Sequence, residues 1–386
     1  MIAVCWTAVA GVAYVIDLLR QTHDGLTNGA GRPFGDDFIN YWSAAFLAWH
    51  GRAAEIYDWA AFHAFEQGVA GATLDFYHYS YPPVLPLLTA PLAPFGYVPG
   101  LAAWLIASWL CFYLALRAAR PERGTLLLAL ATPAVFINAV GGQNGAWTAA
   151  LLGGGLSLVE RRPNVAGVLF GLLICKPQLG LLLPVGLLAG RHFRALIVAV
   201  ITAAVLVLAS ILLFGADMWV AYFHNATFLR EAILEDGSGV WHRMLSVFVA
   251  VRRLGAGVPL AYAVQLAVAV AAAGIVAAVW YRTAPQPAKN ALLVLGTCLA
   301  TPYLQDYDLV VGAFVAIWLT SLCPVEAMPK RLLIGAGLIL LVPLVASPLA
   351  KLTGYEFGPL FIAPVFAIAL EAAWAKSPAR AVSSTA

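Results

Sequence analysis

The stretch RALIVAVITAAVLVLASILLF, residues 194–214, decides the class of fold to which this chain belongs. After its first residue it contains no charged side chain, and an apolar helix of about 20 residues is long enough to cross a bilayer. Similar runs occupy residues 259–281 and 331–349. Of the 386 residues, 62% are hydrophobic and 11% are charged, whereas soluble domains have about 25% charged residues. The sequence therefore predicts an all-α polytopic membrane protein.

The whole chain, residues 1–386, is interpreted as a single membrane domain with about twelve membrane-spanning or re-entrant helices. The first segment lacks the basic start and the cleavage site of a signal peptide, so we expect it to remain as a helix. The five cysteines form no CxxC pair, and neither a disulfide framework nor a zinc site is indicated. The candidate segments are residues 1–19, 98–117, 124–139, 146–159, 165–175, 179–189, 194–214, 259–281, 290–304, 309–322, 331–349 and 359–375.

The short basic connections predict the orientation of the chain, because loops rich in Lys and Arg stay in the cytoplasm. With these connections inside, the polar segments 20–97 and 215–258 become the first and second outer loops. We therefore expect the working site on the outer, periplasm-equivalent side of the membrane. The basic connections are residues 117–123, 160–164, 190–194, 281–289, 329–331 and the tail 375–380.

Residues 165–189, VAGVLFGLLICKPQLGLLLPVGLLA, determine whether this orientation is consistent. A single span would place the basic segment 190–194 outside. Pro177 disfavours a continuous helix, and a lysine at mid-bilayer depth is costly. A hairpin with Lys176-Pro177-Gln178 at its apex returns the chain to the cytoplasm and is favoured over one kinked span.

The first outer loop is expected to carry helices that lie on the membrane surface. Aromatic residues recur at helical spacing in FINYWSAAFLAWHG, which we expect to end at Gly51, and a second helix should end at Gly68. The proline-rich stretch that follows is expected to be extended, with Tyr77, Tyr79 and Tyr81 at headgroup depth.

Several polar residues of the outer segments are candidates for chemistry. Asp36-Asp37 precedes the first surface helix, where one carboxylate can cap the helix and the other can act as a general base. In GGQNG, a tight turn between two helices would require the glycines and Asn144, but it would not require Gln143. Lys176 has no route to water within its apolar segment, and a phosphate is its expected counter-charge.

Two later segments add charged candidates. His242 and Arg243 end the second outer loop, where they form either an interfacial belt or a phosphate contact. In TPYLQDYDL, residues 301–309, one of Asp306 and Asp308 is expected to cap a helix. The other is expected to hold hydroxyl groups or to pair with Lys176 or Arg243. The sequence contains no nucleotide-binding glycine loop, no HExxH and no Ser/His/Asp arrangement.

The order of the segments DFINYWSA, YSYPPVLPLL, GQN, CKPQ and TPYLQDYDL resembles the bacterial GT87 family over residues 36–322. The resemblance implies a GT-C glycosyltransferase that uses a polyprenyl-phosphate sugar, with mannose as the expected sugar, as in mannosyltransferases acting on phosphatidylinositol mannosides. It makes Asp37, followed by Phe38 and Tyr41, the candidate base. Here QDYDL stands where the mycobacterial branch has histidines near the late aspartate motif.

The remaining expectations follow from this resemblance. The donor and its phosphate are assigned to Lys176, Gln178, Arg243, His242, Gln143 and Asn144. The acceptor or sugar is assigned to Asp36, Tyr41, Tyr81, Asp306, Tyr307 and Asp308. We expect inversion at the anomeric carbon, no cofactor and no metal, because the cations take the place of a divalent ion.

The expected partners are the polyprenyl-phosphate sugar, a lipid-linked or glycan acceptor and membrane lipids; no nucleic acid is expected. Two alternatives remain open at this point. The first is a secondary transporter with a substrate pathway along Lys176, Asp306 and Asp308. The second is a non-catalytic, lipid-binding scaffold.

Overall fold

The structure, a computed structural model, describes residues 2–122, 124–237 and 239–374, which form helices joined by turns and loops. Within these residues no β-strand forms, and the only β-type pairing is in isolated bridges. The α-helices are α1 (Ile2–Gln21), α2 (Phe38–Trp49), α3 (Trp59–Ala70), α4 (Val84–Thr89), α5 (Tyr97–Ala119), α6 (Gly124–Ala131), α7 (Pro133–Val140), α8 (Gly145–Leu158), α9 (Pro163–Leu172), α10 (Leu183–Ala189), α11 (Phe193–Phe214), α12 (Asp217–Leu229), α13 (Val247–Arg253), α14 (Val258–Tyr281), α15 (Gln286–Ala300), α16 (Gly312–Thr320), α17 (Lys330–Thr353) and α18 (Gly358–Trp374).

Short 3-10 or π-helical turns join these helices. They are η1 (Ala53–Tyr57), η2 (Ala90–Leu92), η3 (Leu173–Cys175), η4 (Pro177–Gly180), η5 (Arg230–Glu235), η6 (Trp241–Arg243), η7 (Asp306–Val311) and η8 (Val325–Ala327).

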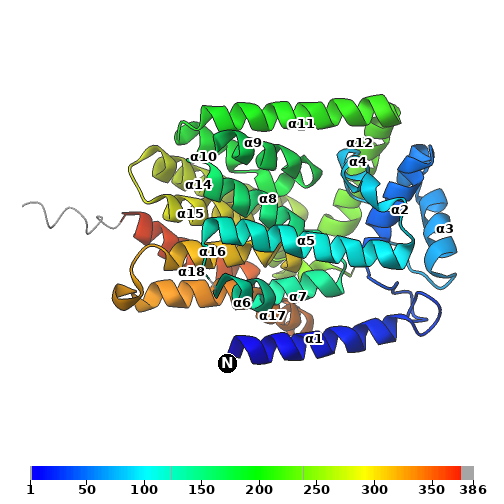
Figure 1. The fold of residues 1–386 in the computed structure, drawn as a ribbon, viewed down its shortest axis with the longest axis horizontal. Coiled ribbons are helices and arrows are strands. Elements are labelled where there is room, and N and C mark those ends of the chain that lie inside the picture. The colour runs from blue at the N-terminus through cyan, green and yellow to red at the C-terminus, as the bar shows by residue number, and fades with distance from the viewer. Residues whose placement is uncertain (1, 123, 238, 375–386) are drawn as a thin grey trace, which may run out of the picture.

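Among the described residues, five helices are long and apolar enough to cross a membrane. They lie in α1, α5, α11, α14 and α17, and α1, α5 and α11 run along the longest axis of the molecule (Figure 1). The expected segment 124–139 is divided into α6 and α7, because Pro133 cannot continue a helix from the preceding turn. The all-helical membrane fold is therefore confirmed, whereas the expected number of about twelve crossings is not.

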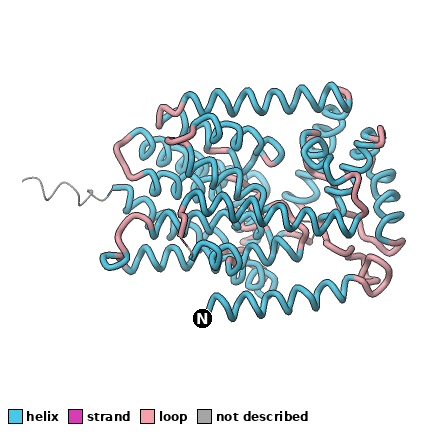
Figure 2. The backbone as a smooth tube through the Cα atoms, viewed as in Figure 1, coloured by secondary structure: helices cyan, strands magenta, loops and turns pink. Residues whose placement is uncertain are grey.

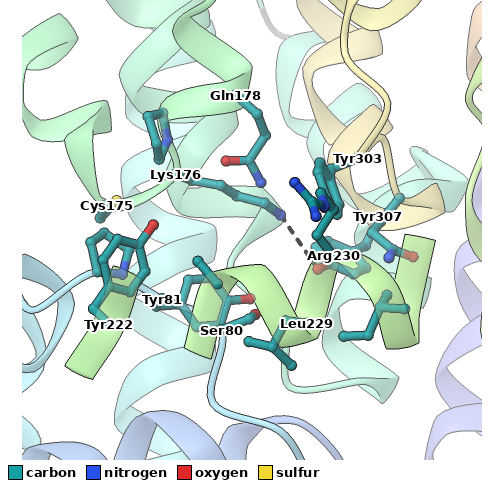
Figure 3. Close-up of a pocket in the computed structure, with 15 residues that line it drawn as sticks. Ser80, Tyr81, Cys175, Lys176, Gln178, Tyr222, Leu229, Arg230, Tyr303 and Tyr307 are labelled. Carbon is teal, nitrogen blue, oxygen red and sulfur yellow. Dashed lines mark hydrogen bonds between the residues drawn. The ribbon is translucent and has the colours of Figure 1, made fainter. Parts of the chain in front are cut away.

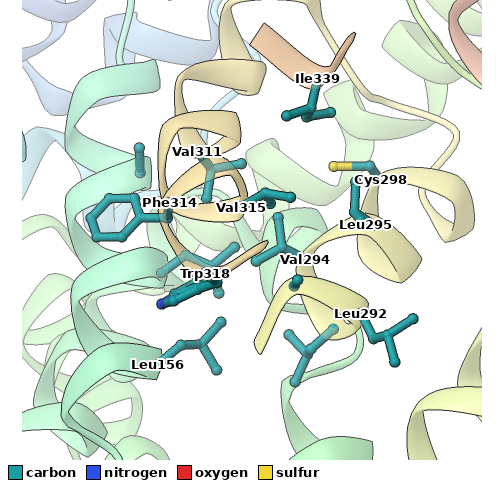
Figure 4. Packing of buried hydrophobic residues seen from close by; sticks show 14 of the residues in the cluster. Leu156, Leu292, Val294, Leu295, Cys298, Val311, Phe314, Val315, Trp318 and Ile339 are labelled. Carbon is teal, nitrogen blue, oxygen red and sulfur yellow. The ribbon is translucent and has the colours of Figure 1, made fainter. Parts of the chain in front are cut away.

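The core is formed by helices that are buried on every side. All residues from Ala291 to Ala300 of α15 and from Gly312 to Leu319 of α16 are buried. Figure 4 shows Phe314, Val315 and Trp318 packed between Leu156 of α8 and the apolar side chains of α15. This central pair of helices supports η7, which carries Asp306 and Asp308 at its start.

The segment 165–189 reverses direction, as the hairpin interpretation expected. Arg194 Nε, at the start of α11, donates a 2.6 Å hydrogen bond to Asn164 Oδ1, at the start of α9. Because both helices begin at the same end and pack along each other, the chain must return between them. The reversal occurs around Lys176, whose backbone is not helical (φ −144°, ψ 68°).

The connections between helices lie at two opposite ends. The α10–α11, α14–α15 and α16–α17 connections lie at the left end in Figure 1. At this end Arg120 Nη1 donates a 3.1 Å hydrogen bond to Thr320 Oγ1. The expected basic connections therefore gather together, except for the tail 375–380, which lies outside the described residues. In Figure 2 the long loop between α1 and α2 lies at the other end, near α2 and α3.

Segments 20–97 and 215–258 pack against each other at that other end. Asn225 Nδ2 of α12 donates a 2.8 Å hydrogen bond to the carbonyl oxygen of Tyr57. The rings of Trp59 and Phe228 meet edge to face, with centroids 4.2 Å apart. Both expected outer loops are therefore ordered helical layers.

The helix expected to begin near Phe38 forms as α2, but it is enclosed by protein and does not lie on the membrane surface. Nine of the twelve residues of α2 are buried, and its aromatic side chains pack against Tyr97, Leu101 and Trp104 of α5. The face opposite its aromatic residues carries Ala44 and Leu47 beside the polar residues Asn40 and Ser43, all of them buried, so the same spacing fits a helix enclosed by protein.

The two other expectations for this loop also need correction. The second helix, α3, ends at Ala70 rather than at Gly68. The proline-rich stretch is non-helical only up to Pro83 and then forms α4 and η2, because prolines are accepted in the first turn of a helix.

Candidate active site

Asp36 is fixed in place by neighbours from two segments. Its backbone is left-handed (φ 49°). Its carboxylate accepts a 2.7 Å hydrogen bond from the Tyr77 hydroxyl and pairs with Arg32 Nη2 at 3.2 Å. Asp37 occupies the position before α2, but its side chain makes no capping hydrogen bond. The expectation that one of the two carboxylates caps α2 is therefore wrong.

Asp37 is held by the GGQNG turn, 106 positions away in the sequence. Gln143 Nε2 donates a hydrogen bond to Asp37 Oδ2. The close approach requires Gly142, which has φ 56° and whose Cβ would lie 2.1 Å from the Gly35 carbonyl oxygen. Gln143, which the turn alone left unexplained, is thus the residue that orients Asp37.

The surroundings of Asp37 raise the pKa of its carboxyl group to about 6. Burial is the main cause, and the adjacent charge of Asp36 adds to it. Arg243, the Gln143 hydrogen bond and Lys176 act in the opposite direction. A carboxylate with a raised pKa is a stronger base, so Asp37 is suited to take a proton from a hydroxyl group during a reaction.

Tyrosine hydroxyl groups extend this network away from Asp37. The Tyr41 hydroxyl lies 3.2 Å from Gln143 Oε1, to which it donates, and 2.7 Å from the Tyr81 hydroxyl. Tyr41 itself is fully buried, whereas Tyr81 is partly accessible. Tyr41 therefore lies outside the cavity and holds the side chains of Gln143 and Tyr81 in place through these hydrogen bonds.

Lys176 lies at the apex of the hairpin, with 3% of its side chain exposed. Its Nζ is 2.5 Å from Asp308 Oδ1, 3.2 Å from Asn144 Oδ1 and 3.4 Å from the Tyr307 hydroxyl. The ammonium group also lies 4.4 Å from the centre of the Tyr307 ring. Within the described residues, the counter-charge of Lys176 is therefore Asp308.

Each of the two late aspartates pairs with a different cation. Asp308 forms a capping box with Gln305 at the start of η7, in addition to its pair with Lys176. Asp306 lies 3.3 Å from Arg243 Nε and accepts a 3.3 Å hydrogen bond from Ser347. The expected cap and the expected pairing with Lys176 or Arg243 are both present.

A cavity of about 380 Å³ opens beside Asp37. We name it the acidic cavity, because three of its lining residues are aspartates and Arg243 is the only Lys or Arg among them. Its lining residues are Asp36, Asp37, Asn40, Asp75, Phe76, Tyr77, His78, Ser80, Tyr81, Ile233, Val240, Arg243, Gln305 and Tyr307.

A second cavity of about 240 Å³, the cationic cavity, adjoins the first. It contains Lys176 and Arg230 and no carboxylate residue, and Figure 3 shows Lys176, Gln178 and Arg230 around the same space. The two cavities share Ser80, Tyr81, Ile233, Gln305 and Tyr307. The lining residues of the cationic cavity are Ser80, Tyr81, Pro82, Cys175, Lys176, Pro177, Gln178, Tyr222, Ala226, Leu229, Arg230, Ile233, Tyr303, Gln305 and Tyr307.

Some of the residues selected from the sequence line neither cavity. His242 contacts the carbonyl oxygen of Gly239 and is not among the lining residues. Others stand one layer behind the cavity walls, where they hold the lining groups. This second set comprises Tyr41, Gln143, Asn144, Asp306 and Asp308.

Other lining residues were not selected from the sequence. Arg230 lies in the second outer loop, where its charge is typical of an exposed helix, and Asp75 looks like an ordinary loop residue. Tyr77 was assigned to headgroup depth, but its hydroxyl contacts Asp36. Within the described residues, no three His, Cys, Asp or Glu side chains are arranged to hold a metal ion.

Residues 79–302, more than half of the chain, match the family model of Glycosyltransferase family 87. The chain belongs to glycosyltransferase family 87. It is thus a membrane glycosyltransferase, rather than the secondary transporter considered as an alternative. No curated protein and no solved structure matches the chain.

The family 87 match is narrower than the expected range 36–322. It includes Gln143, Lys176 and Arg243. It begins after Asp37 and ends before Asp306, so the roles of those carboxylates rest on the geometry of this protein.

Proposed function

We propose that this family 87 enzyme transfers a sugar from a polyprenyl-phosphate donor to an acceptor hydroxyl, with Asp37 as general base. The observation that carries the proposal is the pair of adjoining cavities with opposite charge. A departing phosphate is stabilised by cations, and a hydroxyl that must lose a proton needs a carboxylate. The cationic cavity is therefore assigned to the donor, and the acidic cavity to the acceptor.

Contacts of the cationic cavity support a lipid-phosphate donor. Lys176 and Arg230 supply positive charge, and Gln178 supplies an amide. An apolar cavity of about 180 Å³ between α9, α10 and α11 meets the cationic cavity at Pro177. A donor with its phosphate near Lys176 can therefore extend an apolar tail toward α11.

The proposed reaction is a single displacement. The acceptor oxygen forms a bond to the anomeric carbon while the bond from that carbon to the donor phosphate breaks. Asp37 takes the hydroxyl proton, and the phosphate leaves with the electron pair beside Lys176 and Arg230. Attack from the acidic cavity, opposite the departing phosphate, inverts the configuration of the anomeric carbon.

The distribution of basic residues supports the proposed orientation. The basic connections lie at the end of the bundle opposite the two cavities, and such connections stay in the cytoplasm. We therefore place the site on the periplasmic face of a bacterial cytoplasmic membrane. Mannose is proposed as the sugar, and a lipid-linked or glycan hydroxyl as the acceptor, from the motifs that resemble polyprenyl-phosphate-mannose-dependent members.

The test is transfer of radiolabelled mannose from polyprenyl-phosphate mannose by the purified full-length protein in lipid vesicles that contain membrane glycolipids. Labelled glycolipid with inverted configuration is the expected product, and transfer should continue in EDTA. Failure of the label to reach any acceptor, with an active related enzyme as control, would contradict the proposed donor. Loss of transfer in EDTA with recovery in magnesium would contradict the metal-independent mechanism.

A further inference from the structure

The acidic cavity has more carboxylates than cations. This inference rests on the function proposed above and concerns which acceptors the cavity can bind. Asp36 is paired with Arg32. Arg243, the only Lys or Arg in the lining, is paired with Asp306. Asp37 is held by the neutral amide of Gln143. Among the described residues, neither Asp37 nor Asp75 has a cationic partner in ion-pair contact.

Asp75 is an exposed residue of the acidic cavity lining, and its backbone is fixed by one hydrogen bond. Its backbone N–H donates a 2.9 Å hydrogen bond to the carbonyl oxygen of Gly31. Gly31 has φ 92°, and a Cβ there would lie 2.3 Å from the Asp75 carboxylate. Thus Gly31 leaves the space that this carboxylate occupies. Across the described part of the chain, the Asp75 side chain has neither a hydrogen bond nor an ion pair, so its oxygens are free to accept hydrogen bonds from a ligand.

Aromatic rings stand next to this carboxylate. Phe76 is 55% exposed and stacks on His63, with ring centroids 3.9 Å apart. Phe76, Tyr77 and His78 all line the acidic cavity. A sugar ring presents C–H groups that pack on an aromatic face, and hydroxyl groups that donate hydrogen bonds to carboxylates, which are acceptor-only when ionised.

Asn40 provides a further polar group. It lines the same cavity and is 4% exposed, and its Oδ1 has no hydrogen-bond partner. A buried acceptor without a partner is costly, so this amide of the cavity wall has hydrogen-bonding capacity that the protein leaves unused. The cavity therefore offers hydrogen-bond acceptors and aromatic faces, with no unpaired cation.

We propose that the acidic cavity accepts an electrically neutral sugar unit, and that Asp75 excludes acceptors that carry a phosphate on this unit. The carboxylates of Asp37 and Asp75 accept hydrogen bonds from the sugar hydroxyls, but they repel a phosphate at the same distance. If the acceptor is a phospholipid, its phosphate lies outside this cavity.

The test compares octyl hexosides with their 6-phosphates as acceptors for the full-length enzyme in vesicles, with polyprenyl-phosphate mannose as the donor. We expect kcat/KM to be at least tenfold higher for the neutral glycosides. Asp75→Asn, which keeps the shape of the side chain, should reduce this preference at least fivefold. Asp24→Asn, between α1 and α2 and outside both cavities, is the matched control.

The outcomes separate this inference from the proposed function. Equal transfer to neutral and phosphorylated glycosides would overturn the inference but leave the glycosyl transfer intact. An unchanged preference in Asp75→Asn would overturn the role of Asp75. No transfer to any acceptor under conditions of normal donor binding would instead overturn the proposed reaction.

Discussion

The two cavities differ in how their charged groups are satisfied. In the cationic cavity Lys176 is paired with Asp308, and Arg230 lies 3.2 Å from Glu235 Oε1. In the acidic cavity neither Asp37 nor Asp75 has a cation in ion-pair contact within the part of the chain that the structure describes. A phosphate must therefore compete with carboxylates already present for Lys176 and Arg230, whereas an acceptor hydroxyl finds free carboxylate oxygens. Without substrate, the carboxylates of the acidic cavity are therefore available to accept a proton, whereas Lys176 and Arg230 are still paired with carboxylates.

The largest effect is expected for Asp37→Asn, which removes the base from the acidic cavity. An amide cannot take the hydroxyl proton, so kcat should fall by about 10²–10⁴-fold. Binding of the donor in the cationic cavity should remain, which equilibrium binding of labelled polyprenyl-phosphate mannose measures. Asp24→Asn is the matched control. Transfer near the normal rate in Asp37→Asn would eliminate Asp37 as the base and favour the non-catalytic alternative for this residue.

The next effect concerns the cation of the other cavity. Lys176→Gln should lower kcat by about 10²–10³-fold, because stabilisation of the departing phosphate is lost. It also leaves Asp308 buried without its partner, which costs about 3–5 kcal/mol of stability. The double variant Lys176→Gln/Asp308→Asn should recover thermal stability but not transfer.

Lys351→Gln, an exposed lysine at the end of α17, is the control for this pair of variants. Recovery of transfer in the double variant would show that Lys176 acts through structure alone.

A smaller effect is expected in the pH dependence of the acidic cavity. Since the pKa of Asp37 is about 6, its carboxylate becomes protonated below that pH, and kcat/KM should fall about tenfold for each further pH unit. Asp36→Asn removes a neighbouring negative charge, so the pKa of Asp37 and the acid limb should move to lower pH. If the acid limb of the kcat/KM profile lay at the same pH in both proteins, the charge of Asp36 would not affect the pKa of Asp37, which contradicts the prediction.

The smallest effect concerns Glu66, which lies in α3 behind the acidic cavity. Its side chain is fully buried without hydrogen-bond partners, and burial, followed by the charge of Asp37, raises its pKa well above 4.5. The unfolded chain releases this proton above about pH 4.3, while the folded chain keeps it. Glu66 therefore makes the free energy of unfolding decrease as pH rises from that point.

Glu66→Gln cannot ionise, so its melting temperature should exceed that of the original protein by more at pH 8 than at pH 5. Asp24→Asn again serves as the control. Thermal unfolding in detergent measures this difference. An equal difference at both pH values would mean that Glu66 is charged in the folded protein and adds to the negative charge near the acidic cavity.

Much of the fold could be predicted from the sequence, because long apolar runs and misplaced polar residues are strong signals. The runs at 194–214 and 259–281 form α11 and α14 with small changes at their ends. Lys176 and Pro177 predicted the reversal of the chain, since neither suits the middle of a membrane helix. For the late aspartates, a helix cap and a pairing with Lys176 or Arg243 were among the predictions, and both occur.

The remainder depends on contacts that no local pattern contains. The aromatic spacing of α2 fits a membrane surface and a protein interior equally well, and only the packing of α5 decides between them. Gln143 reaches Asp37 across 106 positions, and Arg230 joins Lys176 through the placement of η5. Asp75 could not be selected because a single loop carboxylate is usually a solvated group.

The pair between Lys176 and Asp308 has a consequence for the biosynthesis of the protein. The two residues are 132 positions apart, so Lys176 leaves the ribosome long before its counter-ion. Until η7 is synthesised, the tip of the α9–α10 hairpin carries a charge that its apolar surroundings disfavour. We therefore expect the hairpin to take up its final depth late, when insertion of the α15–η7 region supplies the carboxylate.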